Sequence, residues 1–256
     1  MADNSKETKR IALVVAALTG EELQATQKDA VRIYGILIDE DFGMCDRQES
    51  KLIQSCKSRK DFDSAISSTL KDWNSSNQFI LYFSGHGEVR KNIYCFKFGK
   101  ELYPFMNLLY ELEIKGVNRT ILIFDSCHSG AAMGTKSEGD STIIEKEEIP
   151  QGTAIITSSK KIEQSYEKKD GSNSVFTNLL CEGIKTGLGG IPTDDGRINV
   201  SDIIKYIRNK LLTAEYSNYY QTPSYDISKA DKSIWITKNP SGQIKQQKKD
   251  DRDNFQ

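Results

Sequence analysis

Two stretches of the chain decide its fold: FILYFSGHG at residues 79–87 and TILIFDSCHSG at residues 120–130. Each begins with a run of apolar and β-branched residues and then changes abruptly to small, polar and chemically reactive ones. Apolar runs without polar alternation are typical of strands covered on both faces, as in a parallel sheet flanked by helices. Because ligands of such sheets gather at the carboxyl ends of the strands, we expect the two polar ends to lie together.

The rest of the chain alternates apolar runs with longer amphipathic stretches. The runs predict further strands, at Ile11–Ala17, Thr153–Thr157 and Ser233–Thr237. Apolar residues at helical spacing predict helices over about Thr26–Asp39, Asp61–Trp73, Met106–Ile114, Ser174–Thr186 and Val200–Ala214, the last capped by Ser201 with Asp202. This alternation predicts an α/β fold in which helices wrap a single sheet.

Length and composition limit the class of protein. At 256 residues, with 37% hydrophobic and 28% charged residues, the chain fits one medium-sized globular domain. Its 35 basic and 36 acidic residues nearly cancel, which argues against nucleic acid or a membrane surface as a partner. No run approaches the ~20 apolar residues of a membrane span. The five cysteines lack metal-ligand spacing, so we expect no metal site, no disulfide framework and a reducing cytoplasm as the location.

Polar segments bound the predicted domain. We expect residues 1–9 to be a disordered N-terminus, residues 10–238 to form the domain, and residues 239–256 to be a polar tail with little to bury. Within the domain, the charged, glycine-bearing segment Gly134–Pro150 is expected to be loose.

The chain has two histidines, His86 and His128, and both lie in the polar ends of the two deciding stretches. A cysteine thiol with a pKa of about 8.5 is a weak nucleophile at neutral pH, and a histidine within about 3 Å activates it by taking its proton. Cys127 is therefore the candidate nucleophile and His86 the candidate base. The backbone N–H groups of Gly87 and Cys127 are candidates for the oxyanion hole. His128 should turn away, because adjacent side chains of an extended chain point to opposite faces.

The same period-two rule makes a prediction about specificity. It puts Ser84 on one face with His86, and Asp125 on one face with Cys127. A carboxylate beside the nucleophile favours a substrate with lysine or arginine at the cleaved position.

Taken together, SGHG followed by DSCHSG resembles the caspase-fold cysteine peptidases, and specifically the metacaspase and prokaryotic caspase-like branch. The separation of the two motifs is close to the ~50 residues typical of caspases. Accessory segments also resemble the family: Lys28-Asp29-Ala30, Ser174-Val175-Phe176-Thr177 and Gln221-Thr222-Pro223. The resemblance covers about residues 10–237.

This resemblance implies a three-layer sandwich around a six-stranded sheet, mostly parallel with its last strand antiparallel. It implies a His86–Cys127 dyad and a pocket for a basic residue formed by Asp125, Asp29, Ser84 and the segment Thr157-Ser158-Ser159, with Ser158 as a contact. It also implies a large segment at about 10–133, a cleavable linker at 134–150 with Lys136 and Lys146 as cut sites, and a small segment at 151–238. Calcium-dependent relatives carry an acidic cluster between His and Cys, and the basic stretch EVRKNIYCFKFGKELYP argues against calcium activation here.

The leading hypothesis is therefore a cysteine endopeptidase that needs no cofactor and cuts proteins or peptides after Arg or Lys. By resemblance it would be a regulated protease of bacterial stress, cell-death or antiviral signalling, switched on by a partner protein or a cleavage. The alternative is a catalytically silent module that keeps the fold and binds partners. A nucleotide-binding domain is disfavoured, because IALVVAALTGEE contains neither GxGxxG nor GxxxxGK[ST].

Overall fold

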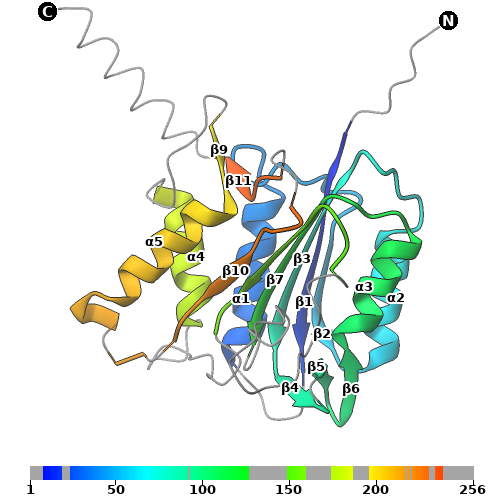
Figure 1. Cartoon of the computed structure of the whole chain (residues 1–256), viewed down its shortest axis with the longest axis horizontal. Helices are drawn as coiled ribbons and strands as arrows, with labels where there is room; N and C mark the ends of the chain where they lie inside the picture. The colour runs from blue at the N-terminus through cyan, green and yellow to red at the C-terminus, as the bar shows by residue number, and fades with distance from the viewer. Residues whose placement is uncertain are drawn as a thin grey trace, which may run out of the picture.

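A computed structural model describes residues 8–18, 24–91, 93–126, 149–159, 174–186, 196–216, 218–219, 221–230 and 234–238. At its centre lies a six-stranded sheet with the strand order β10-β8-β7-β3-β1-β2 (Figure 1). Its strands are β1 (Arg10–Ala17), β2 (Lys51–Cys56), β3 (Gln78–Gly85), β7 (Thr120–Ser126), β8 (Thr153–Thr157) and β10 (Ser224–Asp226). All neighbours pair in parallel except β10, which runs antiparallel to β8. The expected sheet is confirmed.

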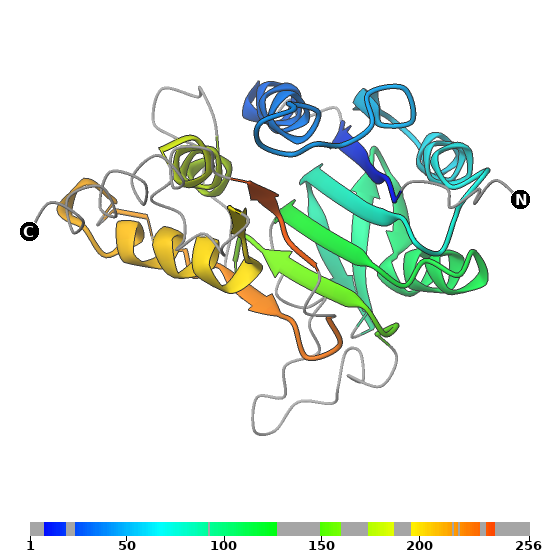
Figure 2. The ribbon, with the colours of Figure 1, turned by 90° about the horizontal axis from the view of Figure 1, so that it is seen from above.

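Helices cover both faces of this sheet, as Figures 1 and 2 show from two directions. One face packs against α1 (Gln24–Leu37), α4 (Val175–Thr186) and α5 (Val200–Leu211), and the other against α2 (Arg59–Thr69) and α3 (Phe105–Ile114). Each face of the sheet has its own hydrophobic core, and alternate residues of β1 pack into one or the other. Val14 belongs to the core under α1, α4 and α5, and Val15 to the core under α2 and α3. Strands β1, β3, β7 and β8 are buried along their whole length, which explains their continuous apolar runs. The three-layer α/β arrangement is confirmed.

A small antiparallel sheet follows β3 directly. It consists of β4 (Gly87–Arg90), β5 (Ile93–Phe98) and β6 (Glu101–Pro104). Aromatic side chains fasten it to the main sheet: the ring of Phe96 lies 4.5 Å from that of Phe83 on β3 and 5.1 Å from that of Phe124 on β7. This sheet therefore sits on the ends of the two deciding strands.

The segment near the C-terminus differs from the expectation. The predicted strand Ser233–Thr237 is wrong as a member of the main sheet: β11 (Thr237–Lys238) pairs instead with β9 (Arg197–Ile198), and the antiparallel edge strand is β10. The carbonyls of Trp235 and Ile236 accept hydrogen bonds from the buried guanidinium of Arg10, at 2.9 and 2.8 Å. A side chain therefore satisfies backbone acceptors that a sheet partner would otherwise take.

The predicted cap of the last helix is also wrong. Helix α5 begins at Val200 after the N-cap Asn199, which forms no side-chain cap bond. Asp202 lies within the first turn, where a carboxylate is favoured by the positive end of the helix dipole. The other predicted helices and strands overlap the observed ones. A short 3-10 helix, η3 (Ala214–Tyr216), follows α5. In the described ranges, no helix is long and apolar enough to cross a membrane.

Candidate active site

The carboxyl ends of β3 and β7 meet side by side. Gly85, the last residue of β3, pairs with Ser126, the last residue of β7, and Ser84 pairs with Asp125. These strands run directly into His86 and Cys127 in the sequence. Cys127 and His128 lie outside the described residues. The structure thus places the two residues that precede the predicted dyad opposite each other.

The turn into His86 depends on Gly85. Its φ of +156° lies where residues with side chains are rarely found, and an added Cβ would lie 2.8 Å from the Cβ of Ala17 on β1. After the turn, the carbonyl of His86 accepts a hydrogen bond from the N–H of Lys97 at 3.0 Å. The neighbouring Gly87 opens β4 and pairs with Phe96 on β5. Strand β5 therefore holds the backbone on which the predicted base and one predicted oxyanion donor stand.

Asp125 and Asp29 meet at the start of α4. The hydroxyls of Ser174 and Thr177 both donate to Asp125 Oδ2, that of Thr177 at 2.7 Å. The backbone N–H of Ser174 donates to Asp29 Oδ2 at 2.8 Å. Both carboxylates are almost fully buried, with exposures of 4% and 0%. The N-terminus of a helix stabilises negative charge. Ser174 connects the carboxylates of Asp125 and Asp29 to the N-terminus of α4.

The hydroxyl of Ser174 also accepts the N–H of Thr177 at 3.0 Å, so it caps α4 while it donates to Asp125. Thr177 in turn contacts the phenol of Tyr82 on β3, at 2.6 Å between the two oxygens. An ionised carboxylate only accepts hydrogen bonds, so Thr177 donates to Asp125 and Tyr82 donates to Thr177. Burial, together with the charges of Asp125 and Asp29, raises the pKa of Tyr82 well above its usual value. The phenol therefore keeps its proton in this chain of bonds.

Ser158 lies just beyond β8 and is fully buried. Its N–H donates to the carbonyl of Phe124 at 2.9 Å, and its hydroxyl contacts the backbone of Ser126. Its carbonyl accepts from the side chain of Gln221 at 2.7 Å. The residue predicted to contact the substrate is thus bound to the strand that leads to Cys127.

A family model of the caspase domain matches residues 9–234. The chain belongs to the caspase family of cysteine peptidases.

Solved structures support the same fold. The crystal structure of Caspase-1 from Spodoptera frugiperda is similar with a TM-score of 0.60 and 13% identity, over 90% of this chain and 91% of that chain. The crystal structure of protein GSU0716 from Geobacter sulfurreducens has a TM-score of 0.57 and 16% identity, over 91% of this chain and 97% of that chain. At such identities the likeness concerns the fold alone. No curated protein sequence matches the chain.

Tyr94 contacts the caspase-family site although the sequence analysis did not single it out. The phenol oxygen of Tyr94 on β5 lies 2.5 Å from the hydroxyl of Ser126, and both residues are buried. Tyr94, Phe96 and Phe98 are fully buried aromatic residues at every second position, which is the period of a strand with an apolar face toward the core. That alternation could have predicted β5. The partner of the Tyr94 hydroxyl could not be predicted, because it comes from β7.

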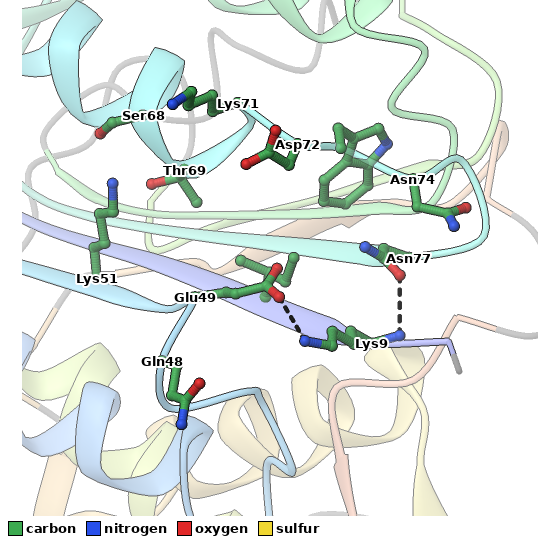
Figure 3. Close-up of a pocket in the computed structure, with 12 residues that line it drawn as sticks. Lys9, Gln48, Glu49, Lys51, Ser68, Thr69, Lys71, Asp72, Asn74 and Asn77 are labelled. Carbon is green, nitrogen blue, oxygen red and sulfur yellow. Dashed lines mark hydrogen bonds and ion pairs between the residues drawn. The ribbon is translucent and has the colours of Figure 1, made fainter. Parts of the chain in front are cut away.

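The remaining candidates lie elsewhere. Lys136 and Lys146, the predicted cut sites, fall outside the described residues. A cavity of about 470 Å³, shown in Figure 3, is lined by residues that include Lys9, Lys51 and Thr69, and Lys9 Nζ pairs with Glu49 at 2.5 Å. It lies where β1 and β2 begin, so it belongs to the end of the sheet opposite the predicted dyad. Among the residues that the structure describes, no group of three or more His, Cys, Asp or Glu side chains is arranged to hold a metal.

Proposed function

We propose that this caspase-family chain is a cysteine endopeptidase that cleaves proteins after arginine or lysine, with Cys127 as nucleophile and His86 as general base. The observation that carries the proposal is the register of β3 and β7, in which Gly85 pairs with Ser126 and Ser84 with Asp125. In the sequence, each member of the first pair is followed by one member of the dyad. Because the two strands end side by side, His86 and Cys127 would emerge at the same edge of the sheet, within reach of the proton transfer that the reaction requires.

The reaction assigns a step to each group. His86 takes the thiol proton of Cys127, and the thiolate attacks the carbonyl carbon of the cleaved peptide bond. The N–H groups of Gly87 and Cys127 stabilise the oxygen on which negative charge develops. His86 then gives the proton to the leaving amine, and water hydrolyses the thioester to release the acid and restore the thiol.

The preference for a basic side chain rests on Asp125. Asp125 lies on β7 two residues before Cys127, so in an extended chain the two side chains share a face. It accepts hydrogen bonds from Ser174 and Thr177. Hydroxyl donors fix a carboxylate in place but do not cancel its charge, so a guanidinium or ammonium group of the substrate can pair with it. Asp29 adds a second buried carboxylate through Ser174.

Two further residues complete the proposed pocket. Ser84 is the register partner of Asp125 and is itself buried, so it borders the carboxylate on the neighbouring strand. Ser158 supports β7, the strand that carries Asp125, through its hydrogen bonds with Ser126.

Regulation is proposed on the family resemblance. Cleavage after Lys136 or Lys146, or the binding of an activating protein, would switch on a cytoplasmic protease of bacterial stress, cell-death or antiviral signalling. The stretch EVRKNIYCFKFGKELYP at residues 88–104 is more basic than acidic, which favours activation without calcium.

Peptides that differ only in the residue before the cleaved bond test the proposal. Wild-type protein and the variants Cys127→Ala and His86→Ala would be mixed with fluorogenic peptides ending in Arg, Lys or Asp. We expect wild type to cleave the Arg and Lys peptides and both variants to lose this activity. Cleavage of the Asp peptide alone would overturn the assigned pocket and leave the peptidase. A Cys127→Ala variant indistinguishable from wild type in every assay would favour the catalytically silent binding module.

A further inference from the structure

Ser126, the residue before the proposed nucleophile, is held at all three of its polar groups. Its N–H donates to Ser158 Oγ at 3.2 Å. Its carbonyl accepts from the hydroxyls of Ser158 and Ser159, at 3.4 and 3.3 Å. Its own hydroxyl contacts the phenol of Tyr94 at 2.5 Å. The four side chains come from β7, β5 and the end of β8, and all of them are buried.

Tyr94 connects this arrangement to the other half of the dyad. It lies on β5, and three residues later on the same strand the N–H of Lys97 donates to the carbonyl of His86. Between them, Phe96 pairs with Gly87. One short strand thus contacts the last residue before Cys127 through a side chain, and the backbone of His86 through its main chain.

Packing alone would account for a buried tyrosine at this place. The ring of Tyr94 lies among Phe96, Phe105 and Phe124, at centroid distances between 5.3 and 6.4 Å. A buried phenol also needs a hydrogen-bond partner wherever it lies. The identity of the partner is the informative feature, because Ser126 directly precedes the proposed nucleophile. A displacement of ~1 Å between reacting groups can lower the rate about a hundredfold.

We propose that Tyr94 is a positioning residue of the peptidase. By binding the hydroxyl of Ser126, it fixes the direction in which the chain leaves β7 toward Cys127. That direction is fixed relative to the backbone of His86, because β5 holds both. This inference rests on the proposed function. Tyr94 touches neither substrate nor the reacting atoms in this role. Its effect reaches the reaction through the distance between the thiol and the imidazole.

The test compares Tyr94→Phe, Ser126→Ala and the double variant with Tyr103→Phe. Tyr103 is a matched control, since it is equally buried in the same aromatic cluster but its hydroxyl bonds to Asp63. We expect Tyr94→Phe and Ser126→Ala each to lower kcat about tenfold with KM unchanged. The double variant should be no worse than either single one. Tyr103→Phe should keep the wild-type kcat. A Tyr94→Phe variant with wild-type kcat, or with the same loss as Tyr103→Phe, would overturn the inference.

A second readout does not require a known substrate. The rate at which iodoacetamide alkylates Cys127 would be followed against pH by mass spectrometry. Pairing with His86 should lower the pH at which the thiol reacts, and both His86→Ala and Tyr94→Phe should shift that profile toward the value of a free thiol, about 8.5. If His86→Ala causes no shift, the proposed dyad itself fails. If His86→Ala shifts the profile and neither Tyr94→Phe nor Ser126→Ala does, the dyad stands and the positioning role fails.

Discussion

Gly85 and Ser126 are register partners on adjacent parallel strands, although the whole β4–β6 sheet and α3 lie between them in the chain. The pairing is a consequence of topology. In a parallel sheet, two neighbouring strands end at the same edge. In the sequence, Gly85 is followed by a histidine and Ser126 by a cysteine, the two members of the proposed dyad.

Replacing Gly85 by alanine should damage both stability and activity. The φ of +156° and the 2.8 Å approach to Ala17 leave no room for a methyl group, and strain of this kind costs about 1–3 kcal/mol. Urea unfolding and peptide cleavage would measure the two effects. Gly35→Ala is the control, because nothing lies within 4 Å of its added Cβ in helix α1, so it should be neutral or slightly stabilising. A Gly85→Ala variant as stable and as active as wild type would contradict the assignment of this turn.

Ser174→Ala should destabilise the protein by about 1–3 kcal/mol. The hydroxyl caps α4 and donates to Asp125, so its removal takes away a helix cap and one donor of a buried carboxylate. The backbone bond to Asp29 would remain. The free energy of unfolding from urea titration provides the measurement. Asn199→Ala at the N-cap of α5, where no side-chain cap bond forms, should cost less. Equal losses in the two variants would show that the Ser174 hydroxyl has no special role.

The sequence predicted the centre of this molecule better than its periphery. The runs at 79–83 and 120–124 predicted buried strands, because residues covered on both faces must be apolar throughout. Strand β2 was not predicted: it lies at the edge of the sheet, and its residues Lys51–Cys56 range from buried to exposed, so no clear period remains. The C-terminal run was assigned to the wrong sheet because the guanidinium of Arg10, distant in sequence, binds its carbonyls.

For the site, the two motifs and the period-two rule predicted which side chains share a face. The pairing of Ser84 with Asp125 was not among these predictions and comes from the register of β3 and β7. The link from Asp125 and Asp29 to Ser174 could not be predicted from the residues alone, since it depends on how the start of α4 meets the sheet. The contact of Tyr94 with Ser126 has the same character, since it depends on how β5 folds back onto β7.

The buried cysteines predict a selective alkylation pattern. Burial raises the pKa of Cys45 to about 11 and those of Cys56 and Cys181 to about 12. These thiols should stay protonated and unreactive toward iodoacetamide at pH 8 in the folded protein, whereas Cys127 reacts. Peptide mass spectrometry with and without urea would measure this, because unfolding should expose all of them. Alkylation of Cys45 or Cys181 at the rate of Cys127 in folded protein would contradict the prediction.

The same thiols should make the fold sensitive to alkali. Their folded pKa values lie above the unfolded value of about 8.5, so their contribution to stability is complete below that pH. Above it, the unfolded chain releases protons first, and stability falls as the pH rises toward the folded values of about 11 to 12. Urea midpoints at pH 7.5, 9 and 10 would follow the loss, and a Cys181→Ala variant should show a shallower decline. An unchanged slope in that variant would remove Cys181 from the explanation.

Asp125→Asn should separate specificity from folding. The amide loses the charge but keeps an oxygen that accepts hydrogen bonds from Ser174 and Thr177. The local structure should therefore be retained. Hydrogen bonds to charged groups contribute about 1.5–3 kcal/mol, so kcat/KM for the Arg peptide should fall about tenfold to a hundredfold. A peptide with an uncharged residue before the cleaved bond should lose much less. Asp202→Asn on the first turn of α5 is the matched control, and it should leave both peptides unaffected. A residue of the substrate pocket must discriminate between substrates. An equal loss for charged and uncharged peptides would therefore mean that Asp125 holds the proposed dyad in place and does not bind the basic side chain of the substrate.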